Sequence, residues 1–372
     1  MSVPLQLAWI LVLYAGLAGL SQACQICVPL PEHTLADRLL ESDAVVLARE
    51  DPARPFYYRA IETLAGAPAD APIDLFLHSQ ARRTLAVYPE RAMVLGYSAK
   101  DRSWSALGIT DPEYERVVRA ILAHADRWVA RETDNAARLD WFLPLLGHAD
   151  GRLHELAYLE IGRAPYAEIR RLARDVPAGS LDLILDDPMY LEWRSLAVLM
   201  LGESERAEDQ ARVRETLARK AAQGISLNLA AWATALMAVD GLKGIRRLES
   251  LYLSGGGRTP EELDAVVQAL SVYGQATPAL RDPVVEAYRR LLEARPEIAP
   301  KLVHDLIAWR RRDLVEPIRR AAGELQGDPL GRYALAFYLR FAEAGHGGPG
   351  GASSTLPAIS DGVSQTDDEE GR

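Results

Sequence analysis

The segments HADGRLHELAYLEIG (148–162) and DDPMYLEWRSLAVLMLG (186–202) decide how most of this chain folds. Each joins a turn that carries an aspartate to a helical pattern with an apolar stripe. Three positions of the first segment recur in the second, each forty residues later: Ala157, Leu159 and Gly162 return as Ala197, Leu199 and Gly202. One helix pair cannot bury its stripe alone, whereas stacked pairs can. The recurrence therefore predicts an array of helix pairs with an extended surface.

The helical pattern covers residues 111–344. Asp111 and Pro112 are suited to an N-cap and a first helical position. The same signal recurs at Asp187–Pro188, Thr259–Pro260, Asp282–Pro283 and Asp328–Pro329. Short loops between the patterns predict antiparallel neighbours. After a first helix that starts at Asp111, we expect helices near residues 134–147, 150–162, 165–176, 188–202, 204–223, 226–239, 241–253, 259–274, 281–294, 296–309, 312–325 and 329–344.

A helix-pair period of about forty residues is typical of HEAT repeats, and the pattern DP…R..A…LG within residues 187–202 resembles the signature of that family. The resemblance implies an all-α solenoid that binds proteins. A tetratricopeptide array is the alternative, but its period of about 34 residues fits less well.

Residues 24–110 have a different pattern. A short helix is expected over residues 34–40, and strands are expected over 43–49, 56–64, 73–78, 92–97 and 103–107. Short strands without a long helix between them predict a small antiparallel β-barrel. The fold class is therefore α+β and multidomain, with a barrel followed by a helical solenoid.

The barrel segment resembles the netrin-like module, which includes the tissue inhibitors of metalloproteinases. The resemblance rests on Cys24 and Cys27, on SDAVVLAR (42–49) and on ETLAG (62–66). It implies an OB-type barrel and, by analogy, a Cys24 amino group that chelates the zinc of a metalloprotease. The Cys-x-x-Cys spacing and the lack of distant cysteines depart from the family pattern. A local disulfide, a two-thiolate metal site and a redox role are the other interpretations of Cys24 and Cys27.

Residues 3–23 are uncharged and apolar, and end in Ser21-Gln22-Ala23. This pattern predicts a signal peptide (1–23) that is cleaved before Cys24. The alternatives are a retained membrane anchor and a lipidated Cys24. The protein is thus expected outside the cytoplasm, periplasmic or secreted. Its preference for arginine over lysine suggests a GC-rich bacterial genome. Residues 345–372 combine glycine and serine with acidic residues, and are expected to be a disordered tail.

The formal net charge of −10 argues against nucleic-acid binding, which requires a basic face. The sequence contains none of the phosphate-binding, nucleophile or dinucleotide motifs that would indicate an enzyme, and we expect no cofactor and no metal. The predicted function is an exported scaffold that binds a protein partner through the helical surface. Candidate binding residues are Cys24, Cys27, and Arg163 and Tyr166 at the junction of two helices.

Overall fold

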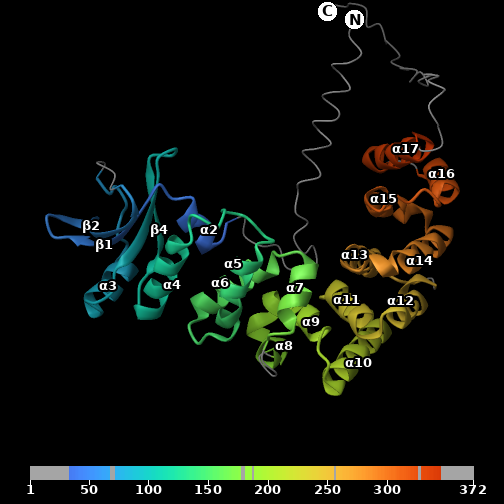
Figure 1. The fold of residues 1–372 in the computed structure, drawn as a ribbon, viewed down its shortest axis with the longest axis horizontal. Helices are drawn as coiled ribbons and strands as arrows, with labels where there is room; N and C mark the ends of the chain where they lie inside the picture. Colours follow the sequence, from blue (N-terminus) through green and yellow to red (C-terminus); the bar gives the residue numbers. More distant parts are fainter. Residues whose placement is uncertain are drawn as a thin grey trace, which may run out of the picture. The chain divides into compact units, whose positions relative to one another are not determined.

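A computed structural model describes residues 33–67, 72–176, 181–186, 188–254, 257–325 and 328–344. The chain divides into two compact units, one up to Arg290 and one from Leu291 onward. Helices and an antiparallel sheet are both present, so the α+β prediction is confirmed (Figure 1). The predicted signal peptide and the predicted acidic tail lie outside the described residues.

The sheet in the first unit has four antiparallel strands in the order β2-β1-β3-β4. Strands β1 (Ala44–Asp51) and β3 (Met93–Ser98) are central and begin with runs of buried apolar residues. Strands β2 (Arg54–Gly66) and β4 (Ser103–Ile109) form the edges and are more exposed. A strand that is covered on both faces needs apolar side chains at successive positions, which explains AVVLA in β1 and MVLG in β3.

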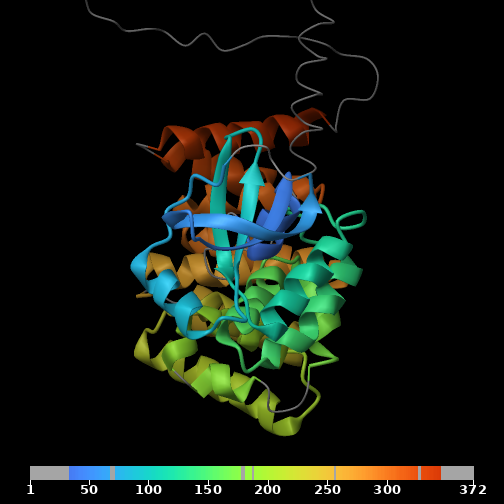
Figure 2. The same cartoon turned by 90° about the vertical axis from the view of Figure 1, so that its left-hand side faces the viewer.

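The four strands form an open sheet, so the prediction of a closed barrel is wrong. The expected strand over residues 73–78 makes only an isolated bridge between Tyr57 and Phe76. The chain then enters α3 (Ser79–Val87), a helix that was not predicted from the sequence. Ala81 and Leu85 of α3, spaced four residues apart, pack on Val46 of β1. A helix therefore covers this face where a further strand was expected (Figure 2).

Helix α2 (Leu35–Leu40) confirms the short helix predicted before the first strand. Thr34 and Asp37 form a capping box at its start. Helix α4 (Pro112–Ala123) confirms the helix predicted from Asp111, whose side chain accepts hydrogen bonds from the backbone N–H groups of Glu113 and Tyr114. Both helices contact the sheet, α2 at β4 and α4 at β2.

The remaining helical segments of the first unit follow the predicted order, except that the short helix Asp182–Asp186 was not predicted. Helix α14 extends across the division into the second unit. The segments are α5 (Ala136–Phe142), η1 (Leu143–Gly147), α6 (Gly151–Gly162), α7 (Tyr166–Ala173), α8 (Asp182–Asp186), η2 (Pro188–Trp193), α9 (Arg194–Leu201), α10 (Ala207–Gln223), α11 (Leu229–Asp240), α12 (Leu242–Leu248), the π-helical turn η3 (Glu249–Leu253), α13 (Pro260–Ala276), η4 (Pro278–Leu280) and α14 (Arg281–Ala294).

Helix α11 is at the centre of these helices. Its first nine residues are all buried, because α9, α10, α12 and α13 each contact it. The sequence LAAWATALM is apolar or small around the whole helix, as a helix surrounded by neighbours requires. Gly202, at the end of α9, lets α9 approach α11 closely, since a Cβ at this position would lie 2.7 Å from the Cα of Ala235.

The described part of the second unit contains η5 (Pro296–Ile298), α15 (Ala299–Ala308), α16 (Val315–Glu324) and α17 (Pro329–Ala344). Helix α17 contacts both α15 and α16. Its buried residues Leu335 and Tyr338 belong to the core that also holds Leu302, Leu306 and Ile318. Among the described residues of both units, we find no helix with the length and apolarity needed to cross a bilayer.

Candidate functional site

Three consecutive segments of the first unit, α10, α11 and α12, position a pocket. Gly241 has φ +54° and ψ −126° and turns the chain between α11 and α12. A side chain would strain this backbone conformation. Gly244 then lets α12 lie close against α11, because a Cβ at this position would be 2.7 Å from the carbonyl oxygen of Leu236.

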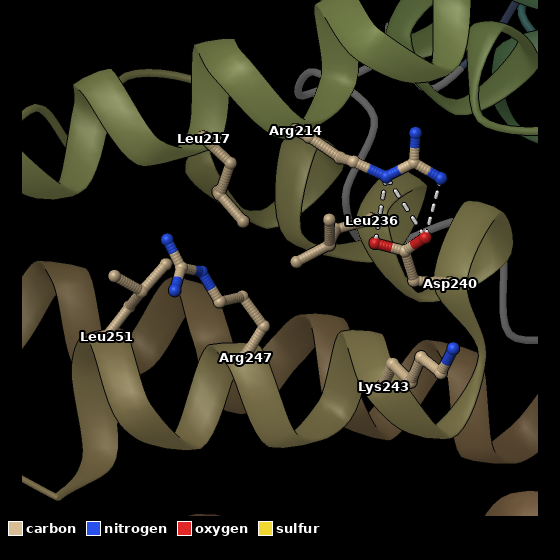
Figure 3. A pocket seen from close by; sticks show the side chains of 7 residues that line it. All are labelled: Arg214, Leu217, Leu236, Asp240, Lys243, Arg247 and Leu251. Carbon is tan, nitrogen blue, oxygen red and sulfur yellow. Dashed lines mark hydrogen bonds and ion pairs between the residues drawn. The ribbon is translucent and has the colours of Figure 1, made fainter. Parts of the chain in front are cut away.

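The pocket has a volume of about 330 Å³, near the lower end for small-ligand sites. Leu217 and Leu236 are buried and Leu251 is partly buried, so these three leucines form an apolar floor. Four charged side chains complete the lining: Arg214, Asp240, Lys243 and Arg247. Figure 3 shows α10 with Arg214 on one side and α12 with Lys243 and Arg247 on the other.

Arg214 and Asp240 neutralise each other at the pocket. The Nε atom of Arg214 donates to both carboxylate oxygens of Asp240 at 3.1 Å, and its Nη2 atom donates to Oδ1 at 2.7 Å (Figure 3). The hydrogen bonds that Arg214 donates to Asp240 raise the pKa of Arg214, although burial works against this shift. This multiple hydrogen bonding fixes the guanidinium geometry between α10 and α11.

Lys243 and Arg247 are one helical turn apart on α12, and both are exposed. Neither makes an ion pair or a side-chain hydrogen bond with any residue in the described part of the chain. The pocket therefore carries two uncompensated positive charges beside an apolar floor. None of its seven lining residues is a serine, threonine, cysteine or histidine, and two cations beside an apolar floor suit the binding of an anionic group on an apolar body.

The four binding residues predicted from the sequence do not line this pocket. Cys24 and Cys27 lie outside the described residues, so the inhibitor, metal and redox interpretations stay predictions. Arg163 and Tyr166 lie at the corner between α6 and α7, but their side chains are buried, with 6% and 4% exposure. In this structure both therefore make internal contacts.

Arg163 belongs to a buried ion cluster, which we define as Asp37, Arg138, Glu160 and Arg163. Arg138 donates to Asp37 at 2.9 Å and to both oxygens of Glu160 at 3.0 Å. Arg163 pairs with both carboxylates, at 3.0 Å from Oδ1 of Asp37 and 2.8 Å from Oε2 of Glu160. Two positive and two negative charges thus hold α2 against α5 and α6.

Asp37 is the most strongly perturbed member of the ion cluster. Burial alone would raise the pKa of this carboxyl group. Hydrogen bonds from Arg163 and from the backbone N–H groups of Arg131 and Thr34 oppose burial, and the net pKa lies well below the usual range. Asp37 is therefore ionised at neutral pH. Every charged member of the ion cluster is paired with another member. The ion cluster therefore has a structural role, which is to hold these helices together.

Tyr166 belongs to a second buried network. Its hydroxyl group donates to Glu203 at 3.0 Å, and Arg170 pairs with the same carboxylate at 2.8 Å. Burial raises the pKa of the Tyr166 hydroxyl well above its ordinary value, so it stays protonated and acts as a donor. Tyr273 packs against Tyr166 with ring centroids 6.5 Å apart. These contacts link α7 to α13 and to the loop after α9.

Lys243 and Arg247 were not among the binding residues predicted from the sequence. The signal available was a pair of cations at i and i+4 in LKGIRRL (242–248), which is also common on solvated helix faces. Comparisons with models of known protein families, with curated proteins and with solved structures found no match.

Proposed function

We propose that the protein is an exported binding protein that holds an acidic, partly apolar segment of a protein partner between α10 and α12. The observation that supports this most directly is the uncompensated charge of Lys243 and Arg247 beside the floor formed by Leu217, Leu236 and Leu251. Carboxylates of the partner would pair with the two cations, and its apolar side chains would cover the leucines. The two cations and the apolar floor together favour partner segments in which acidic and apolar residues alternate.

We also propose that the helices after residue 111 belong to the HEAT-like class. The support is the recurrence of Ala157, Leu159 and Gly162 forty residues later, in two helices, α6 and α9, that are both largely buried. In such arrays the side chains that line successive helices form the binding surface. A pocket built by three consecutive helical segments fits that use.

A peptide-binding measurement tests the proposed function. The probe is a short fluorescein-labelled peptide of leucine and glutamate, and the control peptide has glutamine in place of glutamate. We expect anisotropy to show binding of the acidic peptide alone, which weakens as salt screens the charges. Replacing Lys243 and Arg247 together by alanine is expected to weaken binding about tenfold, equivalent to about 1.4 kcal/mol.

Arg246→Ala is the matched control, since Arg246 is an exposed cation on the same helix that does not line the pocket. It is expected to bind as the unmodified protein does. Equal binding of both peptides, or an equal loss in Arg246→Ala, would contradict the proposal. So would an absence of peptide binding combined with binding to vesicles that contain phosphatidylglycerol, since the pocket would then serve a lipid surface.

A further inference from the structure

The start of strand β2 holds a bulky residue in a strained backbone conformation. Phe56 has φ +67°, in the left-handed region that side chains of this size rarely occupy. Two hydrogen bonds hold it there. Its backbone N–H donates to Oε1 of Glu50 at 3.1 Å, and its carbonyl oxygen accepts from the backbone N–H of Leu77 at 2.7 Å. Strain of this kind persists where the surrounding structure imposes it, and it is concentrated at binding and catalytic sites.

The ring of Phe56 lies on the surface of the first unit, stacked on the ring of Phe76. The two centroids are 5.9 Å apart, the planes differ by 10°, and the two residues are 39% and 58% exposed. Tyr57 meets Phe76 edge-on, with centroids 6.2 Å apart. Single exposed apolar residues are common, whereas grouped ones are typical of a surface that binds something. We name Phe56, Tyr57 and Phe76 the aromatic platform.

Two arginine–carboxylate pairs flank the aromatic platform. Arg82 pairs with Glu50 at 2.8 Å, and its guanidinium carbon lies 4.5 Å from the centroid of the Phe56 ring. Arg54 pairs with Asp74 at 3.2 Å, and its guanidinium carbon lies 3.5 Å from the centroid of the tyrosine ring. These two positive and two negative side chains add no net charge to the platform.

The balanced charge of the flanking pairs favours a neutral ligand. Free cations would attract an anion, but each arginine here already faces a carboxylate. All four side chains stay partly exposed, so they keep hydrogen-bonding capacity toward solvent. A guanidinium only donates and a carboxylate only accepts, whereas a hydroxyl group does both. Neighbouring hydroxyl groups on a neutral molecule can therefore bond to both members of such a pair.

We propose that the aromatic platform binds a neutral sugar. A pyranose ring has apolar C–H groups on its faces and hydroxyl groups around its edge. The C–H face packs against the exposed parts of the Phe56 and Phe76 rings, and the hydroxyl groups bond to the two flanking ion pairs. A few polar groups around an apolar surface are the usual composition of a small-ligand site. This role does not depend on the peptide pocket between α10 and α12.

Isothermal titration calorimetry of the full-length protein with cellohexaose tests the proposal. The hydroxyl groups of a β-linked glucose unit are all equatorial, which leaves the C–H faces of the ring clear for stacking. We expect cellohexaose to bind, with an affinity that does not change when salt is raised, because salt screens only charges. Phe76→Ala is expected to weaken binding about tenfold. Phe76→Tyr keeps the ring and is expected to restore it.

Tyr88→Ala is the matched control. Tyr88 is 43% exposed and has the guanidinium carbon of Arg91 4.1 Å from its ring centroid, but no second ring stacks on it in the described part of the chain. This variant is expected to bind cellohexaose as the unmodified protein does. Phe56→Gly removes a platform ring and relieves the backbone strain, since glycine adopts positive φ freely. We expect it to weaken binding about tenfold without lowering the melting temperature.

Three results would overturn the sugar site. The first is no binding of cellohexaose by the unmodified protein. The second is an equal loss of binding in Phe76→Ala and Tyr88→Ala, or unchanged binding in Phe56→Gly. The third is binding of a proline decapeptide in place of cellohexaose, since the aromatic platform would then hold a protein segment.

Discussion

At the scale of single residues, buried charge is concentrated in the ion cluster of Asp37, Arg138, Glu160 and Arg163. Burying an ion costs several kcal/mol, and only good pairing offsets this penalty. Arg138 is 1% exposed and contacts both carboxylates, as well as the carbonyl oxygen of Val129 at 2.7 Å. Its loss would leave two buried carboxylates that share a single guanidinium, that of Arg163.

We predict that Arg138→Ala destabilises the first unit by about 3–5 kcal/mol, the range for removing one partner of a buried ion pair. Thermal unfolding followed by circular dichroism measures the change. Arg116→Ala is the control, since Arg116 forms an exposed pair with Glu113, and such pairs contribute about 0–1 kcal/mol. Similar midpoints for the two variants would show that the ion cluster does not stabilise the fold.

The perturbed pKa of Asp37 gives a second prediction. A carboxyl group whose pKa is lower in the folded state stabilises the protein above its unfolded pKa, about 3.9, and loses this effect as pH falls toward the folded pKa. We therefore expect Asp37→Asn to lower the melting temperature at neutral pH, and the difference from the unmodified protein to shrink below about pH 4. Melting temperatures measured from pH 7 downward test this. A difference that stays constant over that range would contradict it.

At the scale of elements, the sequence predicts helices better than it predicts the sheet. The helix starts at Asp111–Pro112, Thr259–Pro260 and Asp328–Pro329 are confirmed, because capping is local chemistry. Helix α14 instead begins at Arg281, ahead of the predicted start at Asp282–Pro283. Helix α3 was missed because only Ala81 and Leu85 of its nine residues are buried, which leaves a weak periodic signal. The strand expected over residues 73–78 fails because pairing depends on distant partners that a local pattern does not contain.

The pocket could not be predicted from the sequence for a related reason. Lys243 and Arg247 resemble an ordinary solvated helix face until Gly241 and Gly244 bring α12 against α11. Arg163 and Tyr166 were selected correctly as a helix junction, yet their burial depends on Asp37 and Glu203, which are 126 and 37 residues away in the chain. Pairing between residues so far apart in the chain produces no signal in the local sequence.

Close packing between α11 and α12 leads to a third prediction. Gly244→Ala is expected to destabilise the first unit by about 1–3 kcal/mol, because the new Cβ would overlap the carbonyl oxygen of Leu236. It should also weaken binding of the acidic peptide, since α12 carries both free cations. Thermal unfolding and peptide anisotropy measure the two effects.

Gly151→Ala is the control for that prediction. Gly151 begins α6, and a Cβ at this position would have no neighbouring atom within 4 Å. We expect a change within about 0.5 kcal/mol, in line with substitutions away from packed sites. If Gly244→Ala is as mild as this control, α12 has room to move and the pocket is not held by close packing.

At the scale of the whole molecule, local charge and total charge differ in sign. The peptide pocket exposes the cations Lys243 and Arg247 beside three leucines, whereas the full chain is acidic. An overall net charge of −10 conceals this local excess of positive charge. The proposed function therefore depends on where cations are left unpaired among the described residues, which the composition of the chain does not reveal.

The predicted export of the protein has its own test at this scale, because cleavage, lipidation and retention each give the chain a different mass. We expect intact-mass spectrometry of the protein recovered from a bacterial periplasm to show a chain that begins at Cys24, with Cys24 and Cys27 joined in a disulfide that reduction opens. Ala23→Lys is expected to block cleavage, because the peptidase accepts small residues there. A chain that still begins at Met1 would remove the free Cys24 amine on which the inhibitor prediction depends, and an added lipid would replace release by anchoring.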